Sequence, residues 1–247
     1  MTSTTPAFDG VSGGFSKYWS LDPAVTFLNH GSFGACPIPV LAAQSRIRAR
    51  LEREPVEFLV RELEPMLDEA REALAAFVGA DPEGLAFVPN ATTGVNTVLR
   101  SIEFSPGDEL LTTSHEYNAC RNALDFVAAR SGARVVIADV PFPIGDANEF
   151  LQSMLDLVTS RTRLALFDHI TSLTGMVMPV RKMVAAFNDR GIDTLVDGAH
   201  APGMVPLDLG GLGSSYFTGN CHKWLCAPKG AALLYVREDR REHVHPL

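Results

Sequence analysis

The sequence predicts an α/β protein that is built on a mostly parallel sheet. After Gly79, short apolar runs rich in valine, leucine and isoleucine alternate with segments of helix length. This alternation is typical of parallel strands that are connected by crossover helices. The chain has 247 residues, and 46% of them are hydrophobic. It can therefore bury one large core or two small ones.

The region before the predicted sheet divides into an arm and two helices. Residues 1–25 are polar and rich in glycine, and we expect them to form an N-terminal arm. Two helical patterns follow, over 40–54 and 57–79. The second pattern places four apolar side chains on one face, namely Leu63, Leu67, Ala70 and Leu74.

The remaining elements follow from the apolar runs. Six runs are expected to be strands: 84–89, 109–114, 134–139, 163–169, 193–198 and 214–219. Helices are expected near 93–102, 118–131, 148–159 and 180–190. A last apolar run over 230–238 follows after a short link, so we expect it to pair antiparallel. The sequence shows no helical pattern after that run.

Composition excludes several classes of function. The net charge of −8 argues against a nucleic-acid-binding protein, which needs a basic surface to neutralise phosphates. The first twenty residues lack the pattern of a signal peptide, and no apolar run has membrane-spanning length. We therefore expect a cytoplasmic protein without a membrane partner. Four scattered cysteines do not form a disulfide framework and are expected to stay reduced.

The first candidate site residues follow the first predicted strand. In an open α/β sheet, ligands bind beyond the carboxyl ends of the strands. Thr92 and Thr93 can cap the next helix there, and Gly94 lets its backbone approach another group closely. A helix start of this kind suits a phosphate, although such threonines are more often simple caps. Neither a Walker A loop nor a G-x-G-x-x-G fingerprint is present.

Further polar residues follow the next strands. His115 and Tyr117 offer flat rings on which a ligand ring could stack. The segment 168–172 contains Asp168, His169, Thr171 and Ser172. Asp197 and His200 follow another apolar strand, where a buried acid needs a charged or hydrogen-bonding partner. Taken alone, each acid is explained more simply by a cap or an ion pair.

The last predicted strand before the antiparallel run delivers Asn220, His222 and Lys223. Lys223 lies between an apolar strand and Trp224, a position that can lower its pKa and make it a nucleophile. A lysine that extends its amine into solvent would be the simpler explanation if it stood alone. Cys221, His222 and Cys226 do not have the spacing of a zinc site, so no metal is predicted.

Taken together, these residues favour a functional site over the simpler explanation of each residue alone. A helix start for a phosphate, a stacking ring, a carboxylate for a ring nitrogen and an amine are together what pyridoxal phosphate needs. Five segments then resemble the class V aminotransferase superfamily of pyridoxal-phosphate enzymes, in its isopenicillin N epimerase-like and cysteine desulfurase-like branch. These segments are 27–37 (FLNHGSFGACP), 90–96 (NATTGVN), 168–175 (DHITSLTG), 197–203 (DGAHAPG) and 219–230 (GNCHKWLCAPKG).

The resemblance implies a role for each candidate residue. Lys223 would form the Schiff base, Asp197 would pair with the pyridine nitrogen, and His200 and Ser172 would lie near the ring hydroxyl. Four residues would hold the phosphate, namely Thr92, Thr93, Asn220 and His222. Two residues compete for the stacking position, with Tyr117 favoured over His115. Two residues of the N-terminal active-site segment would face the substrate, namely Asn29 and His30.

The resemblance also implies an architecture. The large domain of fold type I pyridoxal-phosphate-dependent transferases has a mostly parallel, seven-stranded sheet with helices on both faces, and residues 26–247 correspond to it. By this resemblance, we expect the smaller C-terminal domain of the family to be absent from this chain. We therefore expect the natural protein to be longer and homodimeric.

The implied activity is that of an epimerase, or of a C–S lyase or desulfurase, acting on a small amino-acid substrate. One alternative is a truncated fragment that binds the cofactor but is catalytically silent. The other is a nicotinamide oxidoreductase on a doubly wound sheet, which is disfavoured because no strand is followed by the glycine fingerprint.

Overall fold

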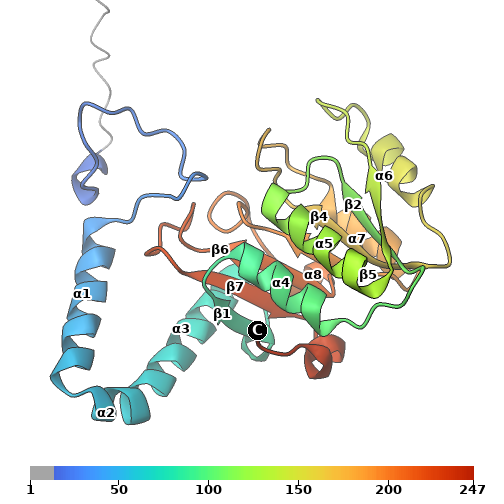
Figure 1. Cartoon of the computed structure of the whole chain (residues 1–247). Coiled ribbons are helices and arrows are strands. Elements are labelled where there is room, and N and C mark those ends of the chain that lie inside the picture. Colours follow the sequence, from blue (N-terminus) through green and yellow to red (C-terminus); the bar gives the residue numbers. More distant parts are fainter. Residues whose placement is uncertain (1–13) are drawn as a thin grey trace, which may run out of the picture.

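A seven-stranded sheet forms the centre of the computed structural model, which describes residues 14–247 (Figure 1). Its order is β1-β7-β6-β5-β4-β2-β3. The strands are β1 (Leu85–Val88), β2 (Glu109–Thr113), β3 (Arg134–Ala138), β4 (Thr162–Asp168), β5 (Asp193–Asp197), β6 (Tyr216–Asn220) and β7 (Ala232–Val236). Strands β2 to β6 pair in parallel, and β7 pairs antiparallel with both β1 and β6. Both the mostly parallel sheet and the antiparallel last strand are confirmed.

Helices cover both faces of this sheet, and each face has its own apolar core. On one face lie α4 (Ala91–Ser101) and α5 (Asn118–Ser131). The other face is covered by the end of α3 (Leu63–Val78) and by α6 (Ala147–Leu155), α7 (Val180–Asn188) and α8 (Leu209–Leu212). The sequence missed α8, because its four residues, Leu-Gly-Gly-Leu, are too few to show a helical period.

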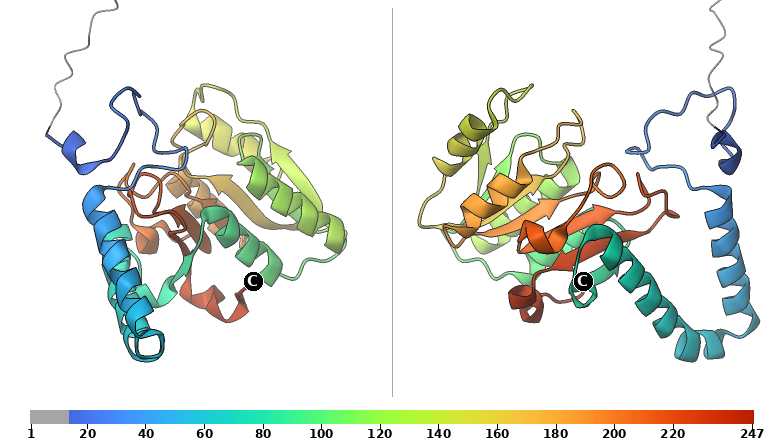
Figure 2. Two further views of the ribbon diagram at one scale, coloured as in Figure 1. Left: turned by 60° about the vertical axis from the view of Figure 1, so that its left-hand side comes forward. Right: turned by 180° about the vertical axis from the view of Figure 1, so that it is seen from behind.

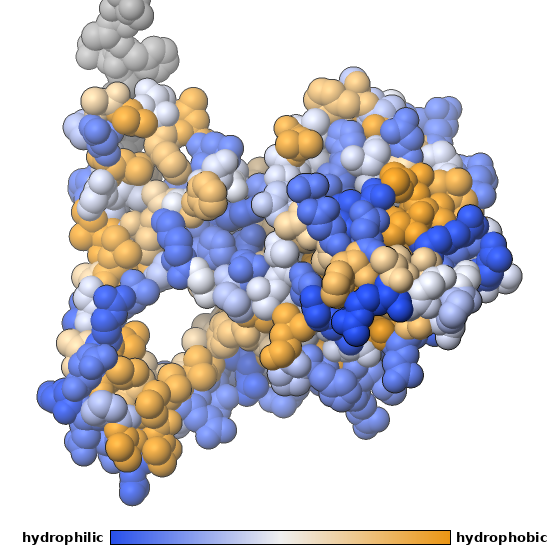
Figure 3. All heavy atoms as spheres, in the orientation of Figure 1, coloured by the Kyte–Doolittle hydropathy of each residue, from blue (hydrophilic) through white to orange (hydrophobic). Residues whose placement is uncertain are grey.

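The helices before the sheet form a bent arm. Helix α1 (Ile38–Arg53) stands apart from the sheet and buries none of its residues (Figures 1 and 2). Pro55 begins the short α2 (Pro55–Glu57), which leads through a π-helical turn (Phe58–Glu62) into α3 (Leu63–Val78). Apolar side chains gather on the surface near this bend, including the exposed Val56, Leu59 and Val60 (Figure 3).

The chain before α1 returns toward the sheet at Gly34. The predicted arm, residues 1–25, lies partly outside the described residues, and its described part contains a short 3-10 helix (Ser16–Tyr18). Gly34 has a φ of 64°. A Cβ on this residue would lie 2.9 Å from the carbonyl oxygen of Lys223. Only glycine therefore allows this segment to pack against the loop that carries Lys223.

The chain after β7 differs from expectation. A 3-10 helix (Glu238–His243) follows the strand, although the sequence showed no helical pattern there. Arg240 donates to both carboxyl oxygens of Asp193 at 3.0 Å, and the guanidinium of Arg237 binds Asp239. These ion pairs stabilise a turn that hydrophobic periodicity could not indicate. Among residues 14–247, no helix combines the length and the apolar character needed to cross a membrane.

Candidate active site

The first turn of α4 forms one wall of the site. The helix begins at Ala91, and its cap is Asn90, whose Oδ1 accepts a hydrogen bond from the Thr93 N–H at 2.8 Å. The expectation that Thr92 and Thr93 cap this helix is therefore wrong, because both lie inside its first turn. Asn220, at the end of β6, accepts a hydrogen bond from the Ala91 N–H at 2.8 Å. The helix start is thus tied directly to the strand that precedes Lys223.

Gly94 makes the close backbone approach that the sequence indicated. The group that it approaches is β6, and Gly94 is buried there. A Cβ on this residue would collide with the side chain of Thr218. The missing side chain therefore allows α4 to pack closely on β6, and this packing places the helix start beside Asn220.

Asp197 forms the base of the site, at the carboxyl end of β5. Its carboxyl group is buried and has two donors: the Ala199 N–H reaches Oδ1 at 2.8 Å, and the Cys120 thiol reaches Oδ2 at 3.1 Å. Burial raises the pKa of Asp197, while these two donors and the charge of Lys223 oppose the rise. The partners that a buried acid needs are therefore Cys120, Ala199 and Lys223.

Lys223 lies opposite Asp197, in the loop that follows β6. Its Nζ is 3.1 Å from Nε2 of His200, and the indole N–H of Trp224 donates to Nδ1 of His200 at 3.4 Å. Burial lowers the pKa of Lys223, and the negative charge of Asp197 offsets part of this effect. Burial and the charge of Lys223 lower the pKa of His200 to about 4. The imidazole is therefore neutral at pH 7.

These elements enclose a pocket of about 680 Å³, within the usual size range of ligand sites. Residues 31–33 also line it. Eight residues that the sequence singled out line the pocket, namely Thr92, Thr93, Tyr117, Ser172, Asp197, Asn220, His222 and Lys223. The structure therefore brings together residues from the ends of several strands, as an open α/β sheet favours.

Four other candidates do not line the pocket: His200, which contacts Lys223, and His115, Asn29 and His30. Nδ1 of His115 lies 3.4 Å from the hydroxyl oxygen of Thr174. Asn29 accepts a hydrogen bond from the Gly31 N–H at 2.8 Å, within its own loop. His30 accepts a hydrogen bond from the Ala35 N–H at 3.2 Å, and its ring packs against Phe27 and Trp224. The predicted substrate contacts of Asn29 and His30 stay predictions.

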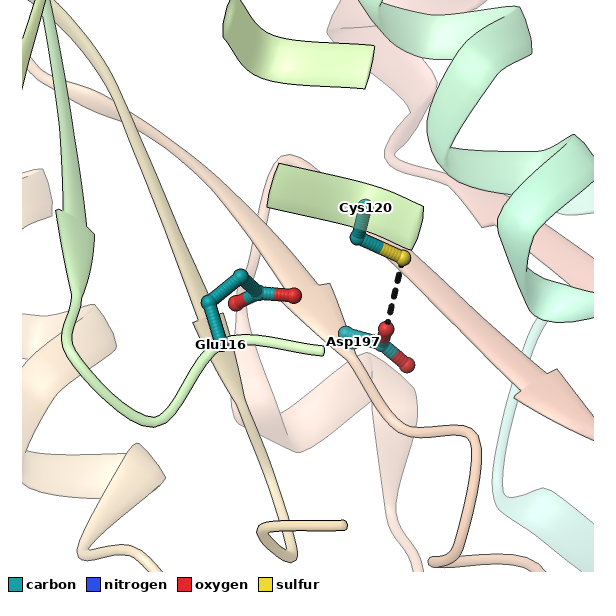
Figure 4. Close-up of side chains that lie close together, drawn as sticks. All are labelled: Glu116, Cys120 and Asp197. Atoms are coloured by element: carbon teal, nitrogen blue, oxygen red, sulfur yellow. Dashed lines mark hydrogen bonds between the residues drawn. The ribbon is translucent and has the colours of Figure 1, made fainter. Parts of the chain in front are cut away.

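Sequence reasoning missed two residues near Asp197, namely Glu116 and Cys120. Figure 4 shows both side chains beside the Asp197 carboxyl group. A carboxyl oxygen of Glu116, Sγ of Cys120 and a carboxyl oxygen of Asp197 all lie within 4.8 Å of one another. Asp168 ends β4 directly opposite Asp197 in the strand register. A signal was available for Glu116, because a charged residue that follows a buried strand needs an explanation.

Comparisons with known proteins show which family the chain resembles. Residues 46–247 match the family model described as Aminotransferase class-V. An isopenicillin N epimerase from Amycolatopsis lactamdurans is 41% identical, over 92% of this chain and 58% of that protein. A putative L-cysteine desulfhydrase from Oryza sativa subsp. japonica is 35% identical, over 88% of this chain and 48% of that protein.

A solved structure confirms the predicted fold class. A lysine-to-alanine variant of the protein C-DES, with glycine covalently linked to its PLP cofactor, has a TM-score of 0.83 to this chain. The two are 27% identical, and the match covers 90% of this chain and 59% of that one. The chain thus spans between about half and three fifths of the length of these relatives. Since the family model matches most of its residues, the chain belongs to the class V aminotransferase family.

Proposed function

We propose that this chain binds pyridoxal phosphate and forms the cofactor-binding part of an enzyme that acts on an amino acid. The enzyme would be isopenicillin N epimerase-like, with epimerisation or C–S bond cleavage as its reaction. The observation that carries this proposal is the meeting of Lys223, Asp197 and the start of α4 around one pocket. The similarity to an epimerase, to a desulfhydrase and to a structure with a PLP cofactor supports the same class.

The chemistry of the pocket fits the phosphate group. The start of α4 presents the positive end of a helix dipole, and Thr92 and Thr93 place their side chains at the same wall. His222 also lines this wall. Asn220 fixes the position of the helix start through the Ala91 N–H. We therefore assign the phosphate to Thr92, Thr93, Asn220 and His222.

The opposite part of the pocket fits the ring. Asp197 is a buried carboxylate, so a protonated ring nitrogen would be a favourable partner for it. Tyr117 lines the pocket and exposes 44% of its surface, which leaves its ring available for stacking. His115 lies next to Thr174 instead, which supports Tyr117 as the stacking residue. Ser172 and His200 would face the ring hydroxyl.

When bound, pyridoxal phosphate supplies an aldehyde that bonds to an amine and a ring that accepts electrons from the substrate. Lys223 Nζ is the amine that would attach it. Because burial lowers its pKa, a larger share of this amine is unprotonated and nucleophilic. The same Nζ, when it is not bound, can take or return the proton at the α-carbon of an amino acid. Asp197 would hold the proton on the ring nitrogen through its negative charge.

The first experiment tests both the cofactor and its position. The purified chain is mixed with pyridoxal phosphate, its visible spectrum is recorded, and the product is reduced with borohydride and mapped by mass spectrometry. We expect a visible band and a label on Lys223. Lys223→Ala should abolish both. Lys182→Ala is the matched control and should keep both, because Lys182 is bound to Asn148 on the surface.

The possible results separate the candidate functions. A label on Lys223 followed by turnover in a screen of amino acids supports the proposed enzyme. A label on Lys223 without any turnover supports a fragment that holds the cofactor but is catalytically silent. No band, or a label spread over Lys182, Lys223 and Lys229, would contradict the proposed site. The expected homodimer and the cytoplasmic location stay predictions.

A further inference from the structure

Glu116 is a buried carboxyl group that the proposed mechanism does not use. It follows β2 and is only 8% exposed. Neither of its carboxyl oxygens has a hydrogen-bond partner. Figure 4 shows the side chain close to those of Cys120 and Asp197. An unpartnered acid at this depth is costly, so its position beside Asp197 needs a physical explanation.

The sheet topology explains why Glu116 lies there. Strands β2 and β4 are neighbours, and the chain proceeds from β2 toward one edge of the sheet and from β4 toward the other. Ligands of open α/β sheets bind beyond such a reversal point. The ends of β2, β4 and β5 therefore bring three acids together, namely Glu116, Asp168 and Asp197.

Three carboxylates cannot all carry a charge in this place. The cation that faces Asp168 and Asp197 is Lys223. Arg121, on α5, acts on Glu116 only from a distance, and its guanidinium is paired with Asp125. Like charges that share a buried site cannot all stay ionised, so the group with the poorest partners takes up a proton first.

The three acids differ in the partners that they have. Asp197 has two hydrogen-bond donors and the nearby charge of Lys223. One carboxyl oxygen of Asp168 has no partner, and both oxygens of Glu116 have none. Burial, followed by the charges of Asp168 and Asp197, raises the pKa of Glu116 well above its ordinary value. The charge of Arg121 opposes this rise only in part.

We propose that Glu116 is a positioning residue that stays a neutral carboxylic acid, so that the negative charge at the base of the pocket is kept on Asp197. The proposal rests on the proposed function, because Asp197 there faces the ring nitrogen. A second negative charge beside Asp197 would change the proton affinity of that ring nitrogen. A neutral Glu116 fills the space without adding this charge.

A metal ion is the competing explanation for the cluster. Glu116, Cys120 and Asp197 are close enough to share one ion, but a metal needs a thiolate and ionised carboxylates. Burial and the charge of Asp197 strongly raise the pKa of the Cys120 thiol. The thiol also donates its hydrogen to Asp197. Both observations indicate that the Cys120 thiol keeps its proton, which disfavours a metal ion at this position.

Infrared spectroscopy of the cofactor-loaded chain tests the protonation state directly. Glutamate labelled with ¹³C at its side-chain carboxyl separates Glu116 from the nearby aspartates. We expect a neutral-acid C=O band at neutral pH, which Glu116→Gln removes. Glu109→Gln is the matched control, because Glu109 is also fully buried but is paired with Arg134 and Arg161. This control should leave the band in place.

A second readout tests the positioning role. Glu116→Gln keeps the side chain neutral. The proton affinity of the bound cofactor, measured from the pH dependence of its visible band, should therefore change by less than about twofold. The inference is overturned if labelled wild-type protein shows no neutral glutamate band. It is equally overturned if Glu116→Gln changes that proton affinity about tenfold or more. If this variant does not fold, the labelled wild-type chain still tests the inference, because the pH dependence of its neutral-acid C=O band shows whether a glutamate is protonated at neutral pH.

The outcomes also distinguish this inference from the proposed function. If Glu116 is ionised, the visible band and the trapped Lys223 peptide of the wild-type protein remain. If the proposed function is wrong, that band and peptide are missing whatever the infrared spectrum shows. Zinc added to the cofactor-free chain completes the test. Loss of the neutral-acid band on adding zinc would favour the metal site and contradict the inference.

Discussion

The indole N–H of Trp224 lies 3.4 Å from Nδ1 of His200, and this contact determines which ring nitrogen of His200 carries a hydrogen. An indole nitrogen can only donate, so Nδ1 must accept and the hydrogen is on Nε2. Nε2 is 3.1 Å from Nζ of Lys223. Lys223 can accept that hydrogen only as a neutral amine. Trp224 therefore favours the neutral, nucleophilic form of Lys223, whereas the charge of Asp197 favours the protonated form.

This arrangement predicts the effect of Trp224→Phe. The variant keeps an aromatic ring but removes the donor, so His200 can move its hydrogen to Nδ1 and accept one from a protonated Lys223. We expect the pKa of Lys223 to rise, because the protonated amine gains an acceptor in His200. The pH dependence of reductive methylation, measured for each lysine of the cofactor-free chain, gives this pKa. Lys182 is the internal control, and an unchanged Lys223 would contradict the tautomer assignment.

The sequence could predict the sheet because its signals are local. Each strand contains a short apolar run, and the longer connecting helices each have their own period, so both can be identified without knowledge of their neighbours. The site was harder to predict. The cap of α4 is Asn90, and not Thr92 or Thr93. The sequence could not identify the cap, because all three are good capping residues and only the backbone geometry distinguishes them. Glu116 was missed because its surroundings come from three strands that are far apart in the sequence.

Gly94→Ala should destabilise the protein. Its Cβ would collide with Thr218 of β6, so α4 would have to move away from the sheet. Overpacking of this kind costs about 1–3 kcal/mol. Gly145→Ala is the matched control, because a Cβ there meets no atom within 4 Å. Urea unfolding of both variants measures the difference, and equal stability of the two would show that α4 does not need the close approach.

Asn220→Ala should weaken both the fold and the binding of pyridoxal phosphate. The change leaves the Ala91 N–H without its acceptor at a buried position. An unsatisfied buried donor costs about 1–3 kcal/mol. Urea unfolding and a fluorescence titration with pyridoxal phosphate measure the two effects. Asn188→Ala is the control, because it removes only exposed hydrogen bonds, one donated to Gly213 and one accepted from Arg237. Unchanged cofactor affinity in Asn220→Ala would remove Asn220 from the proposed phosphate site.

The last prediction concerns the end of the sheet that lies opposite the site. Glu109 begins β2 and is fully buried. Burial raises its pKa, but hydrogen bonds from Arg134, Thr159 and Arg161 outweigh this effect and lower the pKa to about 2. The ionised form is therefore the one that stabilises the fold. Its contribution is present above the ordinary pKa of 4.5 and is lost as the pH falls from there toward about 2.

Glu109→Gln tests whether the ionised carboxylate stabilises the fold and whether this stabilisation is lost as the pH falls. At pH 7 the variant loses the charged hydrogen bonds, and its free energy of unfolding should fall by about 1–3 kcal/mol. At a pH of about 3 the gap to the wild-type protein should narrow, because protonation of the unfolded wild-type chain already removes part of the same contribution. Glu103→Gln, on the exposed surface, should change stability by less than about 0.5 kcal/mol at either pH. A gap for Glu109→Gln that stays constant with pH would mean that Glu109 stabilises the fold by packing, since only a charge makes the contribution depend on pH in this direction.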